Sequence, residues 1–220
     1  MAWRCGGKSN VELIGNLRSA GIIKSNAVAS AMSAIDRADY CSSDPYADSP
    51  QGIGFNVTIS APHMHVYALE ELSQHLTPGA KVLDVGCGSG ILSACMSLMV
   101  GDEGKVVALD YVKGLTDLTT TNINKNRSNL LENGRVTVVL GDGWKGHAEE
   151  APYDCIHVGA AAAAVPDALV QQLAPGGRMI IPVGPQNGDQ YLIRIDKSED
   201  GRRTTNTRLM GVRYVPLVRQ

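Results

Sequence analysis

Three acidic residues after residue 80 each lie at or near the end of a short apolar run. Asp84 lies near the end of the first run, Asp110 ends the second, and Asp142 follows the third between two glycines. If these runs are parallel strands, their carboxyl ends meet at one edge of the sheet, where ligands of such sheets bind. We therefore expect the three carboxylates to line one ligand site.

A glycine-rich loop directly after the first run narrows the kind of ligand. Residues 86–90 read Gly-Cys-Gly-Ser-Gly, and glycines without a Cβ let the backbone approach a ligand closely. The dinucleotide fingerprint places its third glycine one residue later, as G-x-G-x-x-G, and leads a pyrophosphate onto a helix N-terminus. Here the spacing is G-x-G-x-G and Asp84 precedes it, which favours a ligand with positive charge. S-adenosylmethionine carries an ammonium and a sulfonium, and it fits this pattern.

Each acid suits a different part of S-adenosylmethionine. Asp84 suits the charged methionine end, and Asp110 can accept hydrogen bonds from both ribose hydroxyls, because an ionised carboxylate has two acceptor oxygens. Asp142 can accept from the exocyclic amine of adenine. Any single acid could instead be an ordinary turn or cap residue, but three at adjacent strand ends favour a ligand site.

The loop after the fourth apolar run indicates which group accepts the methyl. Residues 159–166 contain no acid, no histidine and no Asn-Pro-Pro-Tyr sequence. An amine acceptor needs a base to free its lone pair, whereas a carboxylate, with a pKa of about 4, is already ionised at neutral pH. A carboxylate needs positioning more than proton removal. The loop therefore favours a carboxylate acceptor, and it leaves open a base elsewhere in the chain.

The elements that would position these residues alternate regularly from residue 80 onward. Short apolar runs cover residues 81–85, 106–110, 136–140, 154–158 and 177–183. Helical stretches lie between them, at residues 91–100, up to about residue 126, and through Leu169 and Leu173. This alternation predicts βαβ units and a parallel sheet covered on both faces. Two later runs, residues 190–195 and 209–217, are joined by a charged turn and predict an antiparallel pair at one edge.

The part of the chain before residue 80 has a different pattern. Ser9 and Ser25 are each placed to cap a short helix within residues 9–35. Residues 40–58 are rich in proline and glycine and predict an irregular loop, and a helix starts near Pro62. Further along, the five alanines at residues 160–164 predict a tight loop and the start of a helix.

Together these patterns predict an α/β fold, and the family resemblance given below implies that it is of the Rossmann-like, S-adenosylmethionine-dependent methyltransferase type. We expect a mostly parallel, doubly wound sheet of seven strands with an antiparallel C-terminal edge. Residues 1–220 are expected to form a single methyltransferase domain. Within it we expect a helical N-terminal extension with a substrate-side loop (1–78), a cofactor-binding core (79–183) and C-terminal strands (184–220).

Composition restricts the partners and the compartment. The formal net charge is −2, from 20 basic and 22 acidic residues, and no basic stripe favours nucleic acid. No run of 18 apolar residues predicts a membrane span, and the N-terminus lacks the apolar region of a signal peptide. Five cysteines without a CxxC pair predict reduced thiols and no metal site. We expect a cytoplasmic (cytosolic) protein. We also expect a monomer, since no sequence pattern indicates an exposed face for self-association.

At this point the sequence resembles the protein-L-isoaspartate (D-aspartate) O-methyltransferase family over essentially its whole length, from Met1-Ala2-Trp3 to Tyr214-Val215-Pro216-Leu217. The glycine loop alone indicates only a methyltransferase, whereas the stretch from Thr58 to His65 is far more specific. The stretches that carry the resemblance are Asp48-Ser49-Pro50-Gln51, Ile53-Gly54-Phe55, Thr58-Ile59-Ser60-Ala61-Pro62-His63-Met64-His65, Gly141-Asp142-Gly143, Ala151-Pro152-Tyr153-Asp154 and Pro175-Gly176-Gly177-Arg178.

The resemblance implies an activity and a set of site residues. The substrates would be L-isoaspartyl and D-aspartyl residues of damaged proteins and peptides, methylated as the first step of repair through a succinimide. Ser60 matches the serine held to be catalytic in the family; a hydroxyl can donate to a carboxylate and orient it, although Ser60 could instead cap the following helix. The implied cofactor contacts are Val57, Thr58, Ile59, Ser60, His65, Asp84, Gly86, Gly88, Ser89, Asp110, Tyr111, Asp142, Gly143 and Val218.

Some positions depart from the family pattern. Cys87 replaces an expected serine, the 160–164 loop is richer in alanine than expected, and Val218 stands where a polar residue is expected. The sequence stops at Gln220, where a longer tail would help to cover the cofactor. Two other functions remain open: a methyltransferase acting on RNA or a small molecule, and a nicotinamide-dinucleotide module. The balanced charge argues against RNA, and the glycine spacing argues against the dinucleotide.

Overall fold

The computed structural model describes residues 5–219. The expectations that involve Met1, Ala2, Trp3 and the end of the tail at Gln220 lie outside the described residues. Among the described helices, none combines the length and the apolar character needed to cross a membrane.

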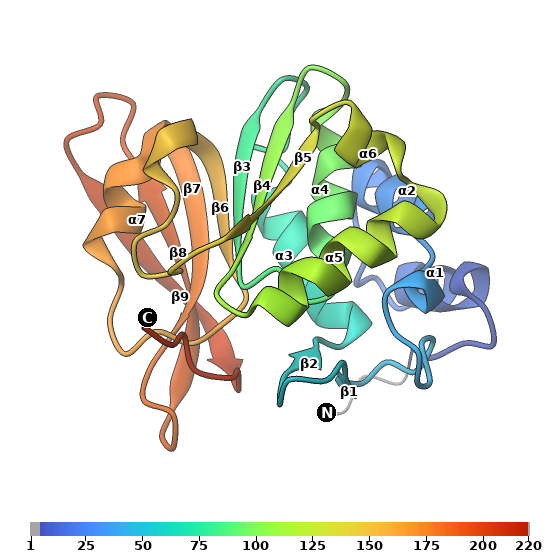
Figure 1. Cartoon of the computed structure of the whole chain (residues 1–220). Helices are drawn as coiled ribbons and strands as arrows, with labels where there is room; N and C mark the ends of the chain where they lie inside the picture. The colour runs from blue at the N-terminus through green and yellow to red at the C-terminus, as the bar shows by residue number, and fades with distance from the viewer. Residues whose placement is uncertain (1–4, 220) are drawn as a thin grey trace.

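A seven-stranded sheet with the order β5-β4-β3-β6-β7-β8-β9 forms the centre of the molecule (Figure 1). Its strands are β3 (Lys81–Val85), β4 (Lys105–Asp110), β5 (Val136–Leu140), β6 (Tyr153–Val158), β7 (Leu173–Val183), β8 (Gln190–Lys197) and β9 (Thr204–Val212). Pairing is parallel from β5 across to β7 and antiparallel from β7 to β9. This confirms the predicted mostly parallel sheet with an antiparallel C-terminal edge.

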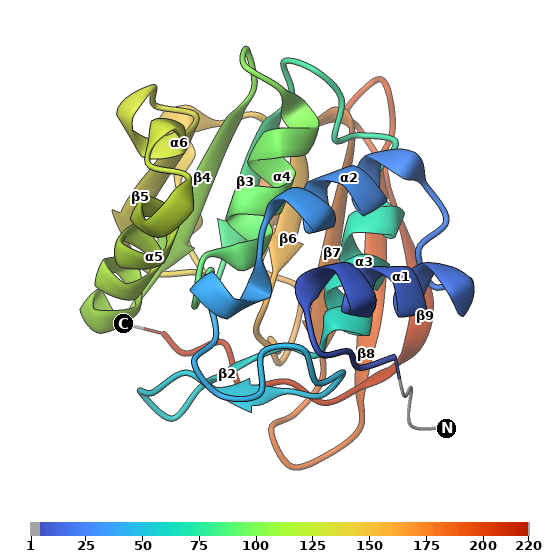
Figure 2. The same cartoon turned by 90° about the vertical axis from the view of Figure 1, so that its right-hand side faces the viewer.

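Helices cover the sheet unequally (Figures 1 and 2). They are α1 (Asn10–Ser19), α2 (Asn26–Ala34), α3 (Pro62–Leu72), α4 (Ile91–Val100), α5 (Lys113–Asn126), α6 (Asn129–Glu132) and α7 (Asp167–Gln172), with short 3-10 turns at Arg37–Asp39 and Ala148–Glu150. Figure 1 shows α1 to α6 on one side of the sheet and α7 on the other. Two buried apolar clusters fill the two sides, because successive strand residues such as Val82 and Leu83 point to opposite faces.

The predicted caps of the first two helices are confirmed. The Ser9 side chain accepts a hydrogen bond from the backbone N–H of Glu12, and Ser25 accepts from that of Val28. Each cap satisfies one backbone donor that the first helical turn leaves without a partner. Helix α2 packs against α3 and α4, and α1 packs against α2, so the N-terminal extension forms one side of the core.

Four expectations about local structure were wrong in detail. The predicted loop at residues 40–58 contains a short strand, β1 (Gln51–Gly52), which pairs with β2 (Thr58–Ile59) where the loop ends. Leu173 begins β7 rather than ending a helix. The alanines at 160–164 do not start a helix: Ala162 bridges to Val183, and α7 begins only at Asp167.

The last strand also ends earlier than predicted, at Val212 rather than Leu217. Past Val212 the chain leaves β8 and pairs with the loop after β6, where Ala161 donates to the carbonyl of Val215 and Leu217 donates to that of Ala161, both at 2.8 Å. An apolar run can pair with either partner, and the sequence pattern does not distinguish them. This C-terminal segment, residues 213–219, brings side chains to the edge of the sheet that carries the site.

Candidate active site

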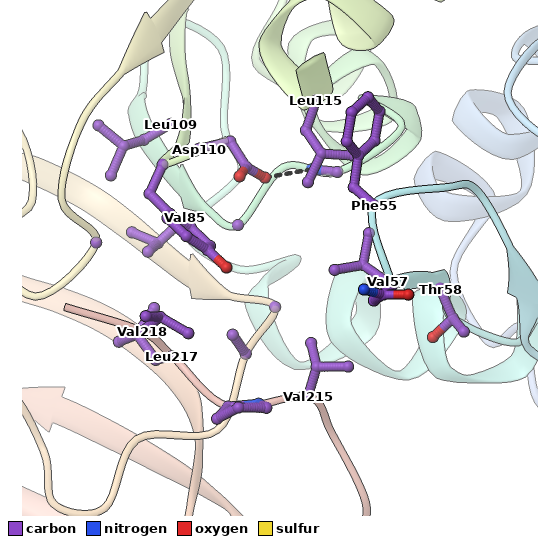
Figure 3. Close-up of a pocket in the computed structure, with 18 of the residues that line it drawn as sticks. Phe55, Val57, Thr58, Val85, Leu109, Asp110, Leu115, Val215, Leu217 and Val218 are labelled. Atoms are coloured by element: carbon purple, nitrogen blue, oxygen red, sulfur yellow. Dashed lines mark hydrogen bonds between the residues drawn. The ribbon is translucent and has the colours of Figure 1, made fainter. Parts of the chain in front are cut away.

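Three adjoining spaces lie at the carboxyl ends of the central strands. The large cavity, of 410 Å³, is the larger of the two spaces that the glycine loop lines, and it lies between residues 55–58 and residues 215–218. Figure 3 shows these two walls facing each other. The inner pocket, of 50 Å³, runs along the glycine loop, and the outer groove, of 570 Å³, opens beside Arg213 and Tyr214. Thr58 and Gly159 line all three spaces. A ligand in the large cavity and inner pocket would therefore touch a second ligand in the groove.

The sheet topology explains why the spaces are there. The chain moves outward from β3 to β4 and β5 and then returns to β6 on the other side of β3. The two loops that diverge from this point, after β3 and after β6, leave a crevice, which is where open α/β sheets bind ligands. Gly86 and Gly159 stand at its base, and the N–H of Gly159 donates to the carbonyl of Val85 at 2.8 Å.

The glycines of the loop after β3 are required by backbone conformation. Gly86, Gly88 and Gly90 have φ values of 75°, 57° and 86°, in the left-handed region that favours glycine. A Cβ on Gly90 would also lie 2.7 Å from the Cγ2 of Thr119. The predicted loop therefore presents backbone rather than side chains to the large cavity and the inner pocket.

Asp110, the predicted ribose contact, lines the large cavity. Its carboxylate accepts hydrogen bonds from the N–H groups of Gly88 and Val112, both at 3.1 Å, and Figure 3 shows it pointing toward the cavity. Burial raises the pKa of this carboxyl. Two backbone donors leave further lone pairs on the two oxygens, so Asp110 can still accept from ligand hydroxyls.

Asp84 borders the inner pocket but is already held by protein partners. One oxygen accepts from the Ser93 hydroxyl at 2.5 Å, and the other lies 2.7 Å from Nδ1 of His157. The pairing of β3 with β6 places Asp84 directly beside His157. A ligand cation would therefore meet a carboxylate whose orientation is fixed. Sequence reasoning missed His157, although a histidine inside a buried apolar strand is the signal that could have found it.

Asp142, whose contact with the adenine amine stays a prediction, is buried in the turn after β5. Its Oδ1 accepts from the N–H of Trp144 at 2.9 Å, and its Oδ2 lies 3.8 Å from Nζ of Lys145. This is the arrangement of a turn residue. The neighbouring Gly143 lines the large cavity, where a Cβ would lie 2.8 Å from Leu217. The loop thus offers the cavity a close backbone approach beside the C-terminal segment.

Ser60 lines both the inner pocket and the outer groove. It does not cap α3, because the N-cap is Ala61 and no side chain caps that helix. Tyr214 lines the same two spaces, and burial raises the pKa of its hydroxyl. Ser60 and Tyr214 therefore form the boundary between the two spaces, and sequence reasoning identified only the first.

A buried arginine holds the segment around Ser60 in place. Arg37, only 2% exposed, donates from Nη2 to the Ser60 carbonyl at 2.8 Å and from Nη1 to Nδ1 of His65 at 3.3 Å. Burial lowers the pKa of Arg37 to about 10, so it stays charged at neutral pH. Since Arg37 can only donate, Nδ1 of His65 accepts and the other ring nitrogen carries the hydrogen. His65, a predicted cofactor contact, borders the inner pocket and is a potential donor there.

The burial of His65 predicts a loss of stability in acid. Burial, followed by the charge of Arg37, holds the pKa of His65 well below 6.5. Below about pH 6.5, His65 is therefore protonated in the unfolded chain but stays neutral in the folded protein. The stability that this site contributes is complete above about pH 6.5 and falls as the pH drops from there toward the lowered pKa of His65. Between pH 7.5 and pH 5.5, the free energy of unfolding in urea should therefore fall less for His65→Gln than for the natural chain, by on the order of 1 kcal/mol. Equal falls in both proteins would contradict a neutral, buried His65.

The other predicted residues lie around the same three spaces. Val57, Thr58, Gly86, Gly88, Tyr111 and Val218 line the large cavity, and Ile59 and Ser89 line the inner pocket. The structure adds Phe55, which packs over Gly114 of α5 so closely that a Cβ there would lie 2.2 Å from the ring. Phe55, the only phenylalanine of the chain, was part of the family resemblance but not predicted to line the cavity.

Comparisons with known proteins agree on one family. The family model described as protein-L-isoaspartate(D-aspartate) O-methyltransferase matches residues 8–220. The protein-L-isoaspartate O-methyltransferase of Caenorhabditis elegans is 51% identical over 197 residues, 90% of this chain and 88% of its own. Protein-L-isoaspartate O-methyltransferase 1 of Arabidopsis thaliana is 47% identical, covering 94% and 90%.

A solved structure extends the agreement to three dimensions. A chain from Plasmodium falciparum, assigned to the protein-L-isoaspartate O-methyltransferases and bound to S-adenosyl-L-homocysteine, superposes with a TM-score of 0.90 at 34% identity. The match covers 97% of this chain and all of that one. The fold of a methyltransferase that holds the demethylated cofactor is thus shared along nearly the whole chain.

Proposed function

Since this chain belongs to the protein-L-isoaspartate(D-aspartate) O-methyltransferase family, we propose that it transfers a methyl group from S-adenosyl-L-methionine to the free carboxylate of L-isoaspartyl and D-aspartyl residues in damaged proteins and peptides. The observation that carries this function is the position of Ser60, between a pocket that continues the large cavity and a groove open to solvent. That arrangement suits two ligands that meet end to end, as methyl transfer requires.

The large cavity and the inner pocket suit the two halves of the cofactor. A volume of 410 Å³ is within the usual range of small-ligand sites. Asp110 would accept from the ribose hydroxyls, and Tyr111, Gly143 and Val218 would surround the adenine. The inner pocket, with Asp84, Ser89 and His65, would take the ammonium and carboxylate of the methionine part. Bound there, the cofactor supplies an electrophilic methyl on its sulfonium.

The outer groove suits the peptide that carries the acceptor. The isoaspartyl carboxylate is ionised at neutral pH, so its oxygen can attack the methyl carbon as the bond from carbon to sulfur breaks. Ser60 would donate its hydroxyl hydrogen to the second carboxylate oxygen and fix the line of attack, and Tyr214 would lie beside both groups. No proton needs to be removed from the acceptor, which agrees with the alanine-rich loop at residues 160–164.

The product leads to repair by its own chemistry. In the methyl ester, the neighbouring amide nitrogen attacks the ester carbonyl, methanol leaves, and a succinimide ring forms. Water then opens the ring to either an aspartyl or an isoaspartyl linkage, and the latter re-enters the cycle. The protein's part ends with the ester.

This function predicts the accumulation of normal aspartate over repeated cycles. A synthetic isoaspartyl peptide incubated with the protein and S-adenosylmethionine should convert progressively to the aspartyl form, which separates on reversed-phase chromatography. A reaction with S-adenosylhomocysteine in place of the methyl donor is the control and should leave the peptide unchanged. Retention of the isoaspartyl form despite consumption of the donor would contradict the repair role.

We also propose that the protein acts as a cytosolic monomer that uses no metal ion and binds neither nucleic acid nor membranes. Five buried free thiols support a reducing compartment, and the balanced charge gives polyanions no general attraction. We retain the division of the domain into an extension with the substrate-side loop (1–78), a core (79–183) and C-terminal strands (184–220). Each of the three parts contributes residues to the spaces around Ser60.

A further inference from the structure

The outer groove contains an unpaired positive charge that the proposed reaction does not use. Arg213 lines the groove together with Gln186, Asn187 and Tyr214, and it is the only charged residue among the described residues of that lining. Its side chain is exposed and, within residues 5–219, has no hydrogen bond or ion pair. Asp189, in the loop that supplies Gln186, is instead within 3.5 Å of the Tyr191 hydroxyl. A cation held at a substrate groove without a partner is available to a substrate.

The position of Arg213 indicates which substrate charge it meets. Ser60 and Tyr214 line both the groove and the inner pocket, so the acceptor carboxylate belongs beside them. Arg213 lines only the groove and is farther from the point of transfer. A guanidinium paired with the acceptor itself would stabilise its negative charge and weaken it as a nucleophile. Arg213 is therefore better placed for a charge on the residue next to the isoaspartate.

On the basis of the proposed function, we propose that Arg213 makes the enzyme favour isoaspartyl sites flanked by acidic residues. The guanidinium forms an ion pair with a glutamate or aspartate carboxylate adjacent to the isoaspartate as the peptide lies in the groove. Gln186 and Asn187 supply amides to the peptide backbone on the same side. Because the pair is solvent-exposed, it contributes a preference rather than an absolute requirement.

The test compares two isoaspartyl peptides that differ only in having glutamate or glutamine on both sides of the isoaspartate. We expect the natural chain to methylate the glutamate peptide with a kcat/KM about 2- to 5-fold higher, as one exposed ion pair allows. Arg213→Ala should reduce the ratio to about 1, Arg213→Lys should keep part of it, and Arg213→Glu should invert it. High salt should reduce the ratio of the natural chain, because exposed charges are screened.

Arg202→Ala is the matched control. Arg202 is also exposed, but it lies in the turn between β8 and β9, at the opposite end of the sheet from the β7–β8 loop (Figure 1). This variant should keep the ratio of the natural chain. An unchanged ratio in Arg213→Ala, or a natural chain that prefers glutamine, would overturn the role of Arg213 and leave the methyltransferase function intact. Failure to methylate either peptide would overturn both proposals.

Discussion

Replacing Asp110 with alanine is expected to weaken S-adenosylhomocysteine binding by about 10- to 150-fold, or ~1.5–3 kcal/mol, the range for hydrogen bonds to a charged group. Asp110 is 4% exposed and points into the large cavity. Its loss removes the acceptor for the ribose hydroxyls and also leaves the N–H groups of Gly88 and Val112 without their partner. Isothermal titration calorimetry measures the change directly.

Two further variants separate binding from folding. Asp110→Asn keeps the shape and one acceptor oxygen, so its loss of affinity should be smaller than that of Asp110→Ala. Asp117→Ala removes an exposed carboxylate on the same side of the fold, which is paired with Lys113 at 2.8 Å. This variant should bind S-adenosylhomocysteine like the natural chain. A dissociation constant unchanged by Asp110→Ala would exclude the ribose contact.

Replacing Ser60 with alanine is expected to lower kcat by up to about 100-fold, the loss that follows when a reacting group is misplaced by about 1 Å. Affinity for S-adenosylhomocysteine should change less than twofold, because Arg37 binds the Ser60 carbonyl, which alanine keeps. Initial rates with an isoaspartyl peptide, measured at saturating methyl donor, give kcat. Calorimetry gives the affinity.

Comparing the change in kcat with the change in affinity for S-adenosylhomocysteine decides the role of Ser60. Loss of affinity with an unchanged kcat would make Ser60 part of the cofactor pocket rather than a group that orients the acceptor. Ser33→Ala is a suitable control, because Ser33 is an exposed serine on α2, away from the three spaces. It should leave both quantities unchanged.

The regular core of the fold was predictable because its sequence signals are local. The apolar run at 81–85, the helix at 91–100 and the positions of Ser9 and Ser25 all agree with the structure. In each case one short segment contains the whole signal, whether a continuous buried strand or a capping side chain. The glycines of the 86–90 loop are a local signal too, because their positive φ values favour glycine at those positions.

The parts that could not be predicted depend on contacts between distant segments. Nothing near Arg37 indicates that it reaches Ser60 and His65. The bond between His157 and Asp84 depends on the register of β6 against β3. Asp142 accepts a hydrogen bond from the N–H of Trp144 in its own turn, and the spacing of the strand-end acids did not indicate this partner. Sequence spacing placed these residues near the site but did not determine their partners.

The most direct test of the central claim is base-labile methyl transfer from labelled S-adenosylmethionine to two synthetic peptides that differ only in aspartate or isoaspartate at one position. We expect label in the isoaspartyl peptide alone, released as volatile methanol on mild base treatment, because only a carboxylate ester is cleaved so readily. Equal label in both peptides, or base-stable label, would contradict the acceptor assigned to the groove at Ser60.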